Sequence, residues 1–597
     1  MAARMGDPTA EDRVHKATEV SRVGTPGADG DLEKTTSVPS GNLVYDADDE
    51  EPVIHIRTYI ALLSMFLMNF VQTFALQGPP SVLSYIGASL HNTQDQTWVP
   101  SALTLMQAVV SPLVSSASDV FQARKWLLVV CSVMSMIGAA IAPGSTDIYR
   151  LIGATVLIGV GFASVGLAFA VPSEILPRKW RPMAQALMNI AACLGAISGP
   201  LTIGAFTKAD IQNGWKNYYW VQMALWGATA IGIFFGYRPP KRHTHLDHLS
   251  FWRKVTHLDL LGFGLLAAGL TMLLVGLGLG GTYPWTSARV LSVLIIGIVT
   301  LVGFAVYQWK GTKTGILHHE LFRGGKAEGR TFAICVVLMT IEGIMLFSYV
   351  IFYPVLTAQL FEADPFLLTA RGVPFWLVSG LSTAAWAFWS MRFRTVRTPL
   401  FAGFLIFTAG LVGLATLRPS DDTRAIVFAS LAGLGFGGPL VLIVAAVQLS
   451  TPHHLIATAT AVTTSARAVG ATVFTAIYSA AFGDEIAKKL PNGIIKAVTQ
   501  AGLAAERIPE FMQAFLGKDT AALSAIPGVN SGVIEAATEA MKVAYADSVR
   551  VVYYIGIAFG ATACVACFFL DDLRGTMNYR VDAPVEHLEA KRPSARD

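Results

Sequence analysis

Two ionisable side chains lie deep inside long apolar stretches of the chain, where a charge is costly. Glu342 lies in LMTIEGIMLFSYVIFY, and Arg467 lies in TSARAVGA. A charged residue at the centre of a bilayer costs roughly 2.5–3.5 kcal/mol on insertion scales, and such residues mark ion and proton pathways. We therefore predict that Glu342 carries a proton and that Arg467 takes part in the coupling. A structural ion pair between the two side chains is the alternative.

Uncharged polar and aromatic residues also occur inside the apolar stretches. They can hydrogen-bond a bound molecule or a neighbouring helix, and a carrier binds its substrate near the middle of the membrane. Because charged residues are scarce there, we expect a bulky, mostly uncharged, amphipathic substrate. The candidates for its cavity are Asn69, Gln72, Gln107, Asn189, Tyr349 and Tyr353.

A second group of charged residues lies at the ends of the apolar stretches. Asp119 precedes a basic pair, Arg124 and Lys125, in SASDVFQARK, and Glu174 and Arg181 are spaced E-x6-R. Opposite charges at the ends of neighbouring helices can hold one side of a bundle closed. We predict that these five residues form a gate at the cytoplasmic side. For the basic residues, solvated loops and membrane topology are the alternative explanation.

The stretch GAISGPLTIG combines Gly195, Gly199, Pro200 and Gly204 in the middle of an apolar segment. Small residues four apart let helix backbones approach closely in lipid. Proline removes one backbone hydrogen bond and can bend the helix. We predict a tight, bent helix at the contact between two halves of the molecule, with simple helix packing as the alternative.

The elements that must position these residues are membrane helices. The 597 residues are 53% hydrophobic and 14% charged, with a mean hydropathy of +0.52. The apolar stretches are about 20 residues long, the length with which a helix crosses a bilayer. We predict an all-α polytopic membrane protein with 14 transmembrane helices, near 58–78, 98–118, 126–143, 151–171, 183–205, 218–237, 258–280, 288–308, 331–357, 372–391, 399–417, 425–449, 455–482 and 549–570.

Lys and Arg are concentrated in alternate loops, and such loops are cytoplasmic. Both termini then lie in the cytoplasm, and segment 483–548 lies outside the cell. Within it, IPEFMQAFLG and VIEAATEAMKVAY are predicted to be amphipathic surface helices. We expect the protein in the cell membrane as a multi-pass protein, with a vacuolar or vesicle membrane as the alternative.

An internal repeat indicates two related halves. VLIGVGFA at 156–163 matches SLAGLGFG at 430–437, and Gly195 falls on Gly470 at a similar offset of about 275 residues. Parallel six-helix repeats are the architecture of alternating-access carriers. The predicted domains are a disordered cytoplasmic tail at 1–57, six-helix bundles at 58–237 and 331–570, a linker with two inserted helices at 238–330, and a cytoplasmic tail at 571–597.

At these residues the chain resembles the major facilitator superfamily. GAISGPLTIG is similar to the fifth-helix motif of drug:proton antiporters, and LDLLG at 258–262 opens a span as in 14-span members. SASDVFQARK resembles the loop between the second and third spans, without its usual glycine. Thr155 stands where the fourth-helix motif has arginine. The stretches VPSEILPRKWRPMAQALMNIAA and YRPPKR resemble the fungal branch that holds trichothecene efflux pumps and siderophore transporters.

The resemblance implies a major facilitator fold, made of two six-helix bundles with two inserted central helices. It also implies proton-coupled efflux of a fungal secondary metabolite, toxin or drug-like compound. A proton-coupled importer of ferric siderophores and a transport-dead membrane sensor are the alternatives. We expect a monomer whose partners are a small-molecule substrate, protons and the lipid bilayer, and not nucleic acid.

We expect no enzyme activity, no cofactor and no metal site. The chain has no GxxxxGK[ST] motif, which argues against an ATP-driven pump. The histidines of RHTHLDH (His243, His245 and His248) are expected to be solvated, and Cys564 and Cys567 are expected to be packing residues.

Overall fold

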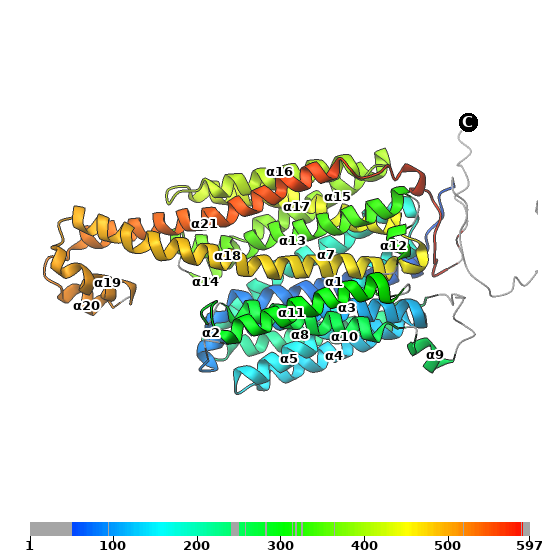
Figure 1. The fold of residues 1–597 in the computed structure, drawn as a ribbon, viewed down its shortest axis with the longest axis horizontal. Helices are drawn as coiled ribbons and strands as arrows, with labels where there is room; N and C mark the ends of the chain where they lie inside the picture. The colour runs from blue at the N-terminus through cyan, green and yellow to red at the C-terminus, as the bar shows by residue number, and fades with distance from the viewer. Residues whose placement is uncertain are drawn as a thin grey trace, which may run out of the picture. The chain divides into compact units, whose positions relative to one another are not determined.

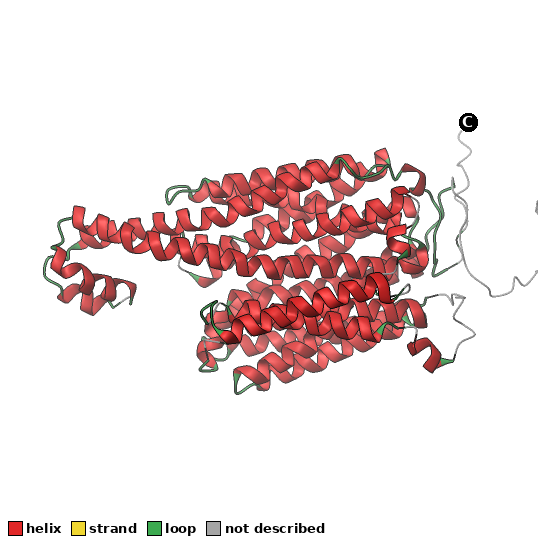
Figure 2. Ribbon diagram, in the orientation of Figure 1, coloured by secondary structure: helices red, strands yellow, loops and turns green. Residues whose placement is uncertain are grey.

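The computed structural model describes residues 50–92, 95–239, 250–256, 258–280, 283–312, 315–316, 319–323, 326–362, 364–517, 519–586 and 588. These residues form helices joined by short links (Figure 2). Residues 1–49 of the predicted tail at 1–57 and the histidines of RHTHLDH lie outside the described residues, and the last two residues of that predicted tail begin helix α1.

The first half of the protein, which we call the N half, contains the first six predicted spans (Figure 1). The fourth span is broken at Ser164 into two helices, because Ser164 leaves the helical conformation. The helices are α1 (Ile56–Ser81), α2 (Leu83–Ser89), α3 (Trp98–Phe121), α4 (Arg124–Ile141), α5 (Ile148–Ala163), α6 (Val165–Ile175), α7 (Arg181–Ala209) and α8 (Gly214–Gly236).

The second half, the C half, contains the last six predicted spans. Its helices are α13 (Lys326–Leu360), α14 (Pro365–Ala370), α15 (Val373–Phe393), α16 (Arg397–Ala415), α17 (Asp422–Ser450), α18 (Ile456–Gln500), α19 (Ile508–Leu516), α20 (Thr520–Ala525) and α21 (Ser531–Cys567). Between the halves lie α9 (Phe251–Thr256), α10 (Leu260–Leu279), α11 (Ala288–Val306) and α12 (Glu320–Arg323).

Eleven helices among the described residues are long and apolar enough to cross a membrane. The other three predicted spans are also long helices, α8, α15 and α18, but they are less apolar. The helical, membrane-spanning architecture is therefore confirmed, while the count of 14 spans stays a prediction.

The sequence repeat corresponds to equivalent packing in the two halves. A Cβ atom added at Gly195 of α7 would lie closer than 3.0 Å to the carbonyl oxygen of Phe70 in α1. A Cβ atom added at its counterpart, Gly470 of α18, would likewise lie closer than 3.0 Å to the side chain of Thr340 in α13. In each half, a glycine therefore brings the fifth span of that half against its first span, as expected of a duplicated six-helix unit.

The inserted helices α10 and α11 lie at the seam between the two halves. They pack on each other, and α10 places Leu270 in one apolar cluster with Ala108 and Val109 of α3 and Ala468 of α18. Only 28% of the apolar window of α10 and 17% of that of α11 is buried. Their remaining surface is apolar, which suits contact with lipid.

The segment that follows the thirteenth span has a small apolar core of its own. Helices α18 and α21 extend beyond the other helices at the left of Figure 1, and α19 and α20 pack beside these extensions. Phe511 of α19 and Val533 of α21 are fully buried in this core. VIEAATEAMKVAY is helical as predicted, and its residues are the first turns of helix α21, which continues without a break into the last predicted span.

Candidate functional site

Basic residues gather at one end of the helix bundle, which we call the basic end. Arg124 begins α4, Arg181 begins α7 and Arg397 begins α16, while α13 begins just before Arg330. The predicted gate residues lie at this end, where the last turn of α3 meets the first turns of α4 and α18.

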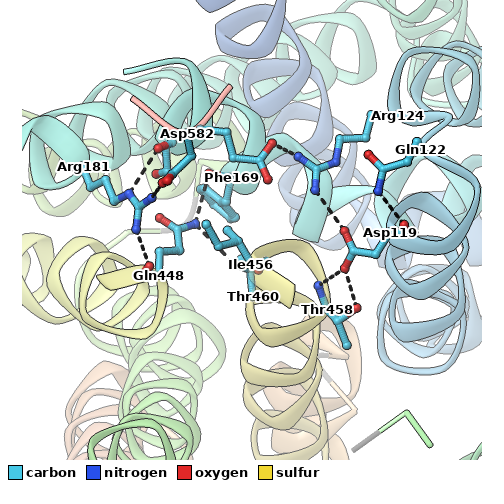
Figure 3. Close-up of polar contacts among 12 residues, drawn as sticks. Asp119, Gln122, Arg124, Phe169, Arg181, Gln448, Ile456, Thr458, Thr460 and Asp582 are labelled. Carbon is cyan, nitrogen blue, oxygen red and sulfur yellow. Dashed lines mark hydrogen bonds and ion pairs between the residues drawn. The ribbon is translucent and has the colours of Figure 1, made fainter. Parts of the chain in front are cut away.

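Asp119 joins the two halves at the basic end (Figure 3). Its Oδ1 atom lies 2.9 Å from Nη2 of Arg124 in the N half. Its Oδ2 atom accepts hydrogen bonds from the backbone N–H (3.1 Å) and the hydroxyl (2.7 Å) of Thr458 in α18. The Asp119 side chain is only 9% exposed, so these contacts replace most of the water that a carboxylate requires.

Arg124 lies between two carboxylates. Besides Asp119, its Nη1 atom contacts Oε2 of Glu174, whose side chain is 1% exposed. A left-handed turn holds this cluster: Gln122 has a φ of 53°, and its amide donates a 2.7 Å hydrogen bond to the backbone oxygen of Asp119. The left-handed conformation favours glycine, and the family pattern of this loop includes a glycine. Here the hydrogen bond to Asp119 stabilises Gln122 in that conformation.

Arg181 makes a second connection between the halves. It donates to the backbone oxygens of Ser173 (3.1 Å) and of Gln448 in α17, and its Nη2 atom lies 2.5 Å from Oδ2 of Asp582 (Figure 3). The guanidinium is 2% exposed, so its charge is balanced by the Asp582 carboxylate. Asp582 follows the last helix, in the segment predicted to be only a tail.

Gln448 is also a buried link between the halves. Its amide donates to the backbone oxygen of Phe169 in α6 (3.2 Å) and to the hydroxyl of Thr460 in α18 (3.2 Å). It also accepts a 3.2 Å hydrogen bond from Gln185 of α7. The sequence reasoning missed Gln448, although an amide inside the apolar α17 was a usable signal, and it missed Asp582 and Thr458, for which the sequence has no local signal.

Lys125 is not part of this polar cluster. Its Nζ atom lies 4.7 Å from the centre of the Phe234 ring on α8. The structure therefore separates Lys125 from the other four predicted gate residues, because adjacent residues at a helix start point in different directions.

Glu342 of α13 and Arg467 of α18 form a buried ion pair. Nε of Arg467 lies 2.6 Å from Oε2 of Glu342, and Nη2 donates a 3.2 Å hydrogen bond to Oε1. Glu342 is 0% exposed and Arg467 is 21% exposed. Gly343 lets the two helices meet here, since a Cβ atom at this position would lie 2.8 Å from the backbone oxygen of Arg467. The ion pair that the sequence left open is thus present within the C half.

The motif helix α7 contacts the C half, for example through Asn189 and Thr383 of α15, while two of its motif glycines pack inside the N half. Gly195 and Gly199 both face α1, where added Cβ atoms would lie closer than 3.0 Å to the backbone oxygens of Phe70 and Phe74. A Cβ atom added at Gly204 would have only the Thr369 hydroxyl of α14 within 4 Å, at 3.9 Å. Pro200 lies inside α7. Gly195 and Gly199 therefore allow close helix packing within the N half, whereas Gly204 faces the C half.

Three of the four amide candidates for a substrate cavity have hydrogen-bond partners in the protein. Asn69 donates to its own helix and to Sδ of Met188. Gln72 donates a 3.0 Å hydrogen bond to the backbone oxygen of Gly161. Asn189 donates across the halves to the hydroxyl of Thr383 in α15, at 2.6 Å. Gln107 is buried on α3, at 8% exposure.

The tyrosine candidates lie in an aromatic stack. The rings of Tyr349 and Phe375 stack at 4.0 Å, and those of Tyr349 and Tyr353 at 4.9 Å. Both tyrosines are almost fully buried, and their hydroxyls have no hydrogen-bond partner among the described residues. A buried hydroxyl without a partner costs roughly 1–3 kcal/mol, so both tyrosines retain an unused hydrogen-bonding capacity in this state.

The described residues contain no group of three or more metal-binding side chains. Cys564 and Cys567 are free thiols near the end of α21.

Comparison with known proteins adds the family. The family described as "Fungal trichothecene efflux pump (TRI12)" matches residues 45–593. The trichothecene efflux pump TRI12 of Fusarium sporotrichioides is 23% identical over 524 residues, which are 86% of each chain. The MFS-type efflux transporter pyiT of Pyricularia grisea is 24% identical over 509 residues, 83% of this chain and 78% of that protein.

Among solved structures, the proton:xylose symporter XylE covers 87% of this chain and 98% of its own, with 12% identity and a TM-score of 0.48. The family match includes the whole helical part of the chain and its C-terminal segment. The chain therefore belongs to the fungal trichothecene efflux pump family, within the major facilitator superfamily of membrane transporters.

Proposed function

We propose that this transporter, working as a monomer in the plasma membrane, exports a mostly uncharged, amphipathic secondary metabolite and that proton entry drives the export. The names of the two relatives above describe efflux, which favours export over siderophore import. The fungal trichothecenes after which the family is described are the first compounds to test.

The observation that carries the proton-driven mechanism is the ion pair of Glu342 and Arg467. Glu342 is fully buried and its only cationic contact is Arg467, among the described residues. Protonation of Glu342 removes its charge and leaves Arg467 without a counter-ion. Because a largely buried charge without a partner is unfavourable, protonation of Glu342 favours a rearrangement of the C half around Arg467. A proton is thereby coupled to a change in helix packing.

Alternating access requires that the basic end opens and closes. The alternation of basic loops assigns the basic end to the cytoplasm. In the described structure, Asp119 with Thr458 and Arg181 with Gln448 connect the halves there. Access of substrate from the cytoplasm requires these contacts to break, and the closed arrangement then corresponds to a state that has already taken up its cargo or faces outward.

The aromatic stack is the part of the proposed substrate site with the clearest chemistry. The rings of Tyr349, Tyr353 and Phe375 stack on one another in this closed state, so a ligand would separate them, and the two tyrosine hydroxyls without partners would then supply hydrogen bonds. Aromatic faces with a few placed polar groups are typical of sites for drug-sized ligands. This combination suits a fused-ring compound with a few oxygen atoms better than a highly charged ferric chelate.

Inside-out membrane vesicles test the direction and the energy source together. With an acidic interior, we expect ATP-independent accumulation of a radiolabelled trichothecene, because protons then leave the vesicle as substrate enters. The control is the same vesicle with the gradient collapsed by an uncoupler. Accumulation of a ferric siderophore under the opposite gradient, with none of the trichothecene, would contradict the proposal.

A further inference from the structure

The C-terminal segment 571–586 passes from the C half to the N half at the basic end. It begins after α21, where the Asp571 carboxylate pairs with Arg330 and accepts a 3.1 Å hydrogen bond from the hydroxyl of Thr331. Arg330 and Thr331 belong to the first turns of α13. Leu573 and Met577 then pack into the large apolar core. The start of the segment is therefore fixed to the C half by the chain itself and by side-chain contacts.

The second part of the segment is bound to the N half through its backbone. The backbone N–H of Lys179 donates a 2.8 Å hydrogen bond to the backbone oxygen of Asn578, and the backbone N–H of Arg178 donates a 3.0 Å hydrogen bond to that of Arg580. The backbone N–H of Ala583 donates to the backbone oxygen of Glu174, at 2.9 Å. The link between α6 and α7 thus pairs with an extended stretch of the segment.

Two acidic side chains complete the attachment to the N half. Asp582 accepts from Arg178 at 2.7 Å and from Arg181 at 2.5 Å, and its side chain is 4% exposed. Glu586 accepts from the backbone N–H of His55 at 2.8 Å and from the hydroxyl of Thr58 at 2.6 Å. Glu586 is 8% exposed. Charge-assisted hydrogen bonds of buried groups are stronger than neutral ones, so these two carboxylates carry specific binding.

We propose that segment 571–586 is a releasable latch of the gate, which holds the N half against the C half while the basic end is closed and leaves the N half when that end opens. This inference rests on the proposed alternating access. The halves cannot separate at the basic end while the segment keeps both sets of contacts. The segment is covalently continuous with α21 of the C half. The contacts that break are therefore the hydrogen bonds between residues 578–586 and the N half.

The latch adds Asp582 and Glu586 to the gate that the sequence predicted from Asp119, Arg124, Glu174 and Arg181. Asp582 balances the charge of Arg181 in the closed state. When the latch leaves, Arg178 and Arg181 lose this carboxylate together. The strength of the latch therefore sets how much of the protein is open at the basic end at any moment.

The first experiment measures opening directly, without substrate or a proton gradient. Ser118→Cys places a thiol at a fully buried position beside the gate, where the serine hydroxyl has no hydrogen-bond partner among the described residues. In inside-out vesicles, adding Asp582→Asn should raise the rate of maleimide labelling about tenfold, because it removes a charge-assisted bond to each of two arginines. The parent protein without Ser118→Cys gives the baseline of the native cysteines.

Asp572→Asn is the matched control. Asp572 lies in the same segment, but its side chain is 64% exposed. Its ion pair is with Arg574 of that segment and not with a residue of the N half. We expect this variant to label at the parent rate. Equal labelling of the Asp582→Asn and Asp572→Asn proteins would overturn the proposal, because the segment would then not hold the gate.

A disulfide cross-link tests whether the latch must leave. Thr58→Cys with Glu586→Cys replaces two side chains that are hydrogen-bonded in the closed state. The oxidised protein should lose at least nine-tenths of its transport and regain it after reduction. Unchanged transport with a complete cross-link would show that the segment moves with the N half, and would overturn release. If labelling responds as expected while no efflux of any tested compound is seen, the latch stands and the proposed function fails.

Discussion

The carboxylate of Asp119 on α3 binds both the backbone N–H and the hydroxyl of Thr458 on α18. One side chain thus connects the last turn of a helix in the N half with the first turn of a helix in the C half. The same carboxylate pairs with Arg124 at 2.9 Å, so charge within the N half and contact between the halves depend on a single group. Loss of its charge should loosen both.

Asp119→Asn should lower the free energy of unfolding in detergent by about 1.5–3 kcal/mol, because it removes a buried charge that is paired and hydrogen-bonded. Thr458→Val should cost about 1 kcal/mol, since the backbone N–H of residue 458 can still donate to Asp119. Chemical unfolding of the two single variants and the double variant gives the coupling between them. Strictly additive effects would show that the two residues do not interact in solution.

Gly343→Ala should damage the ion pair without touching either charged residue. The new methyl group would lie 2.8 Å from the backbone oxygen of Arg467, so α13 and α18 must move apart. We expect a loss of about 1–3 kcal/mol in stability and a strong loss of uphill transport. Gly303→Ala on α11 is the control, because nothing lies within 4 Å of the added Cβ atom. A fully active, stable Gly343→Ala protein would mean that this close approach is not needed.

The motif GAISGPLTIG contains its own control. Gly195→Ala should reduce the amount of folded protein, because its methyl group would meet the carbonyl oxygen of Phe70. Gly204→Ala should be tolerated, because its nearest neighbour is the Thr369 hydroxyl at 3.9 Å. Membrane protein level and transport per molecule separate folding from function. Pro200→Ala should keep the protein level and impair transport, and normal transport by this variant would leave the motif with a packing role only.

The latch should respond to acid only below the physiological range. Burial alone would raise the pKa of Asp582, but Arg181 and Arg178 outweigh it and hold this pKa below its usual value. A lowered folded-state pKa gives stability that is present above the unfolded pKa of about 3.9 and is lost as the pH falls through the folded pKa. The difference in unfolding free energy between the parent and Asp582→Asn should therefore be constant from pH 5 to 8, within the usual working range, and shrink near pH 3. A difference that already disappears at about pH 6 would contradict this assignment.

The sequence predicted the helices well because the bilayer imposes a length and an apolar composition on each of them. For example, α1 (Ile56–Ser81) and α13 (Lys326–Leu360) begin and end within five residues of the predicted spans 58–78 and 331–357. The pairing of Glu342 with Arg467 was also within reach, because a charge in an apolar helix needs a partner. The helix predicted in VIEAATEAMKVAY is present, but the sequence did not show that it is continuous with the last predicted span, because a helix can pass from polar to apolar turns without any break in hydrogen bonding.

The gate could be predicted only in part. Asp119, Arg124 and Glu174 stand out as charges at helix ends, and the structure brings them together. Asp582 could not be found in the same way, because the partner of Arg181 lies 401 residues further along the chain in a segment without a helical or apolar pattern. The neighbour of each glycine in GAISGPLTIG could not be predicted for a similar reason: glycine spacing predicts close packing but does not identify the neighbouring helix, which is α1 for Gly195 and Gly199 and α14 for Gly204.

Uphill transport by Glu342→Gln is the most direct measurement of the central claim that proton entry through this residue drives export. Glutamine keeps the size and can accept a hydrogen bond from Arg467, but it cannot take up a proton. In vesicles with an imposed pH gradient, we expect the variant to lose substrate accumulation while binding or downhill exchange of substrate remains. Glu535→Gln, an exposed position on α21, should behave as the parent. Accumulation by Glu342→Gln with the parent's dependence on the pH gradient would contradict the account.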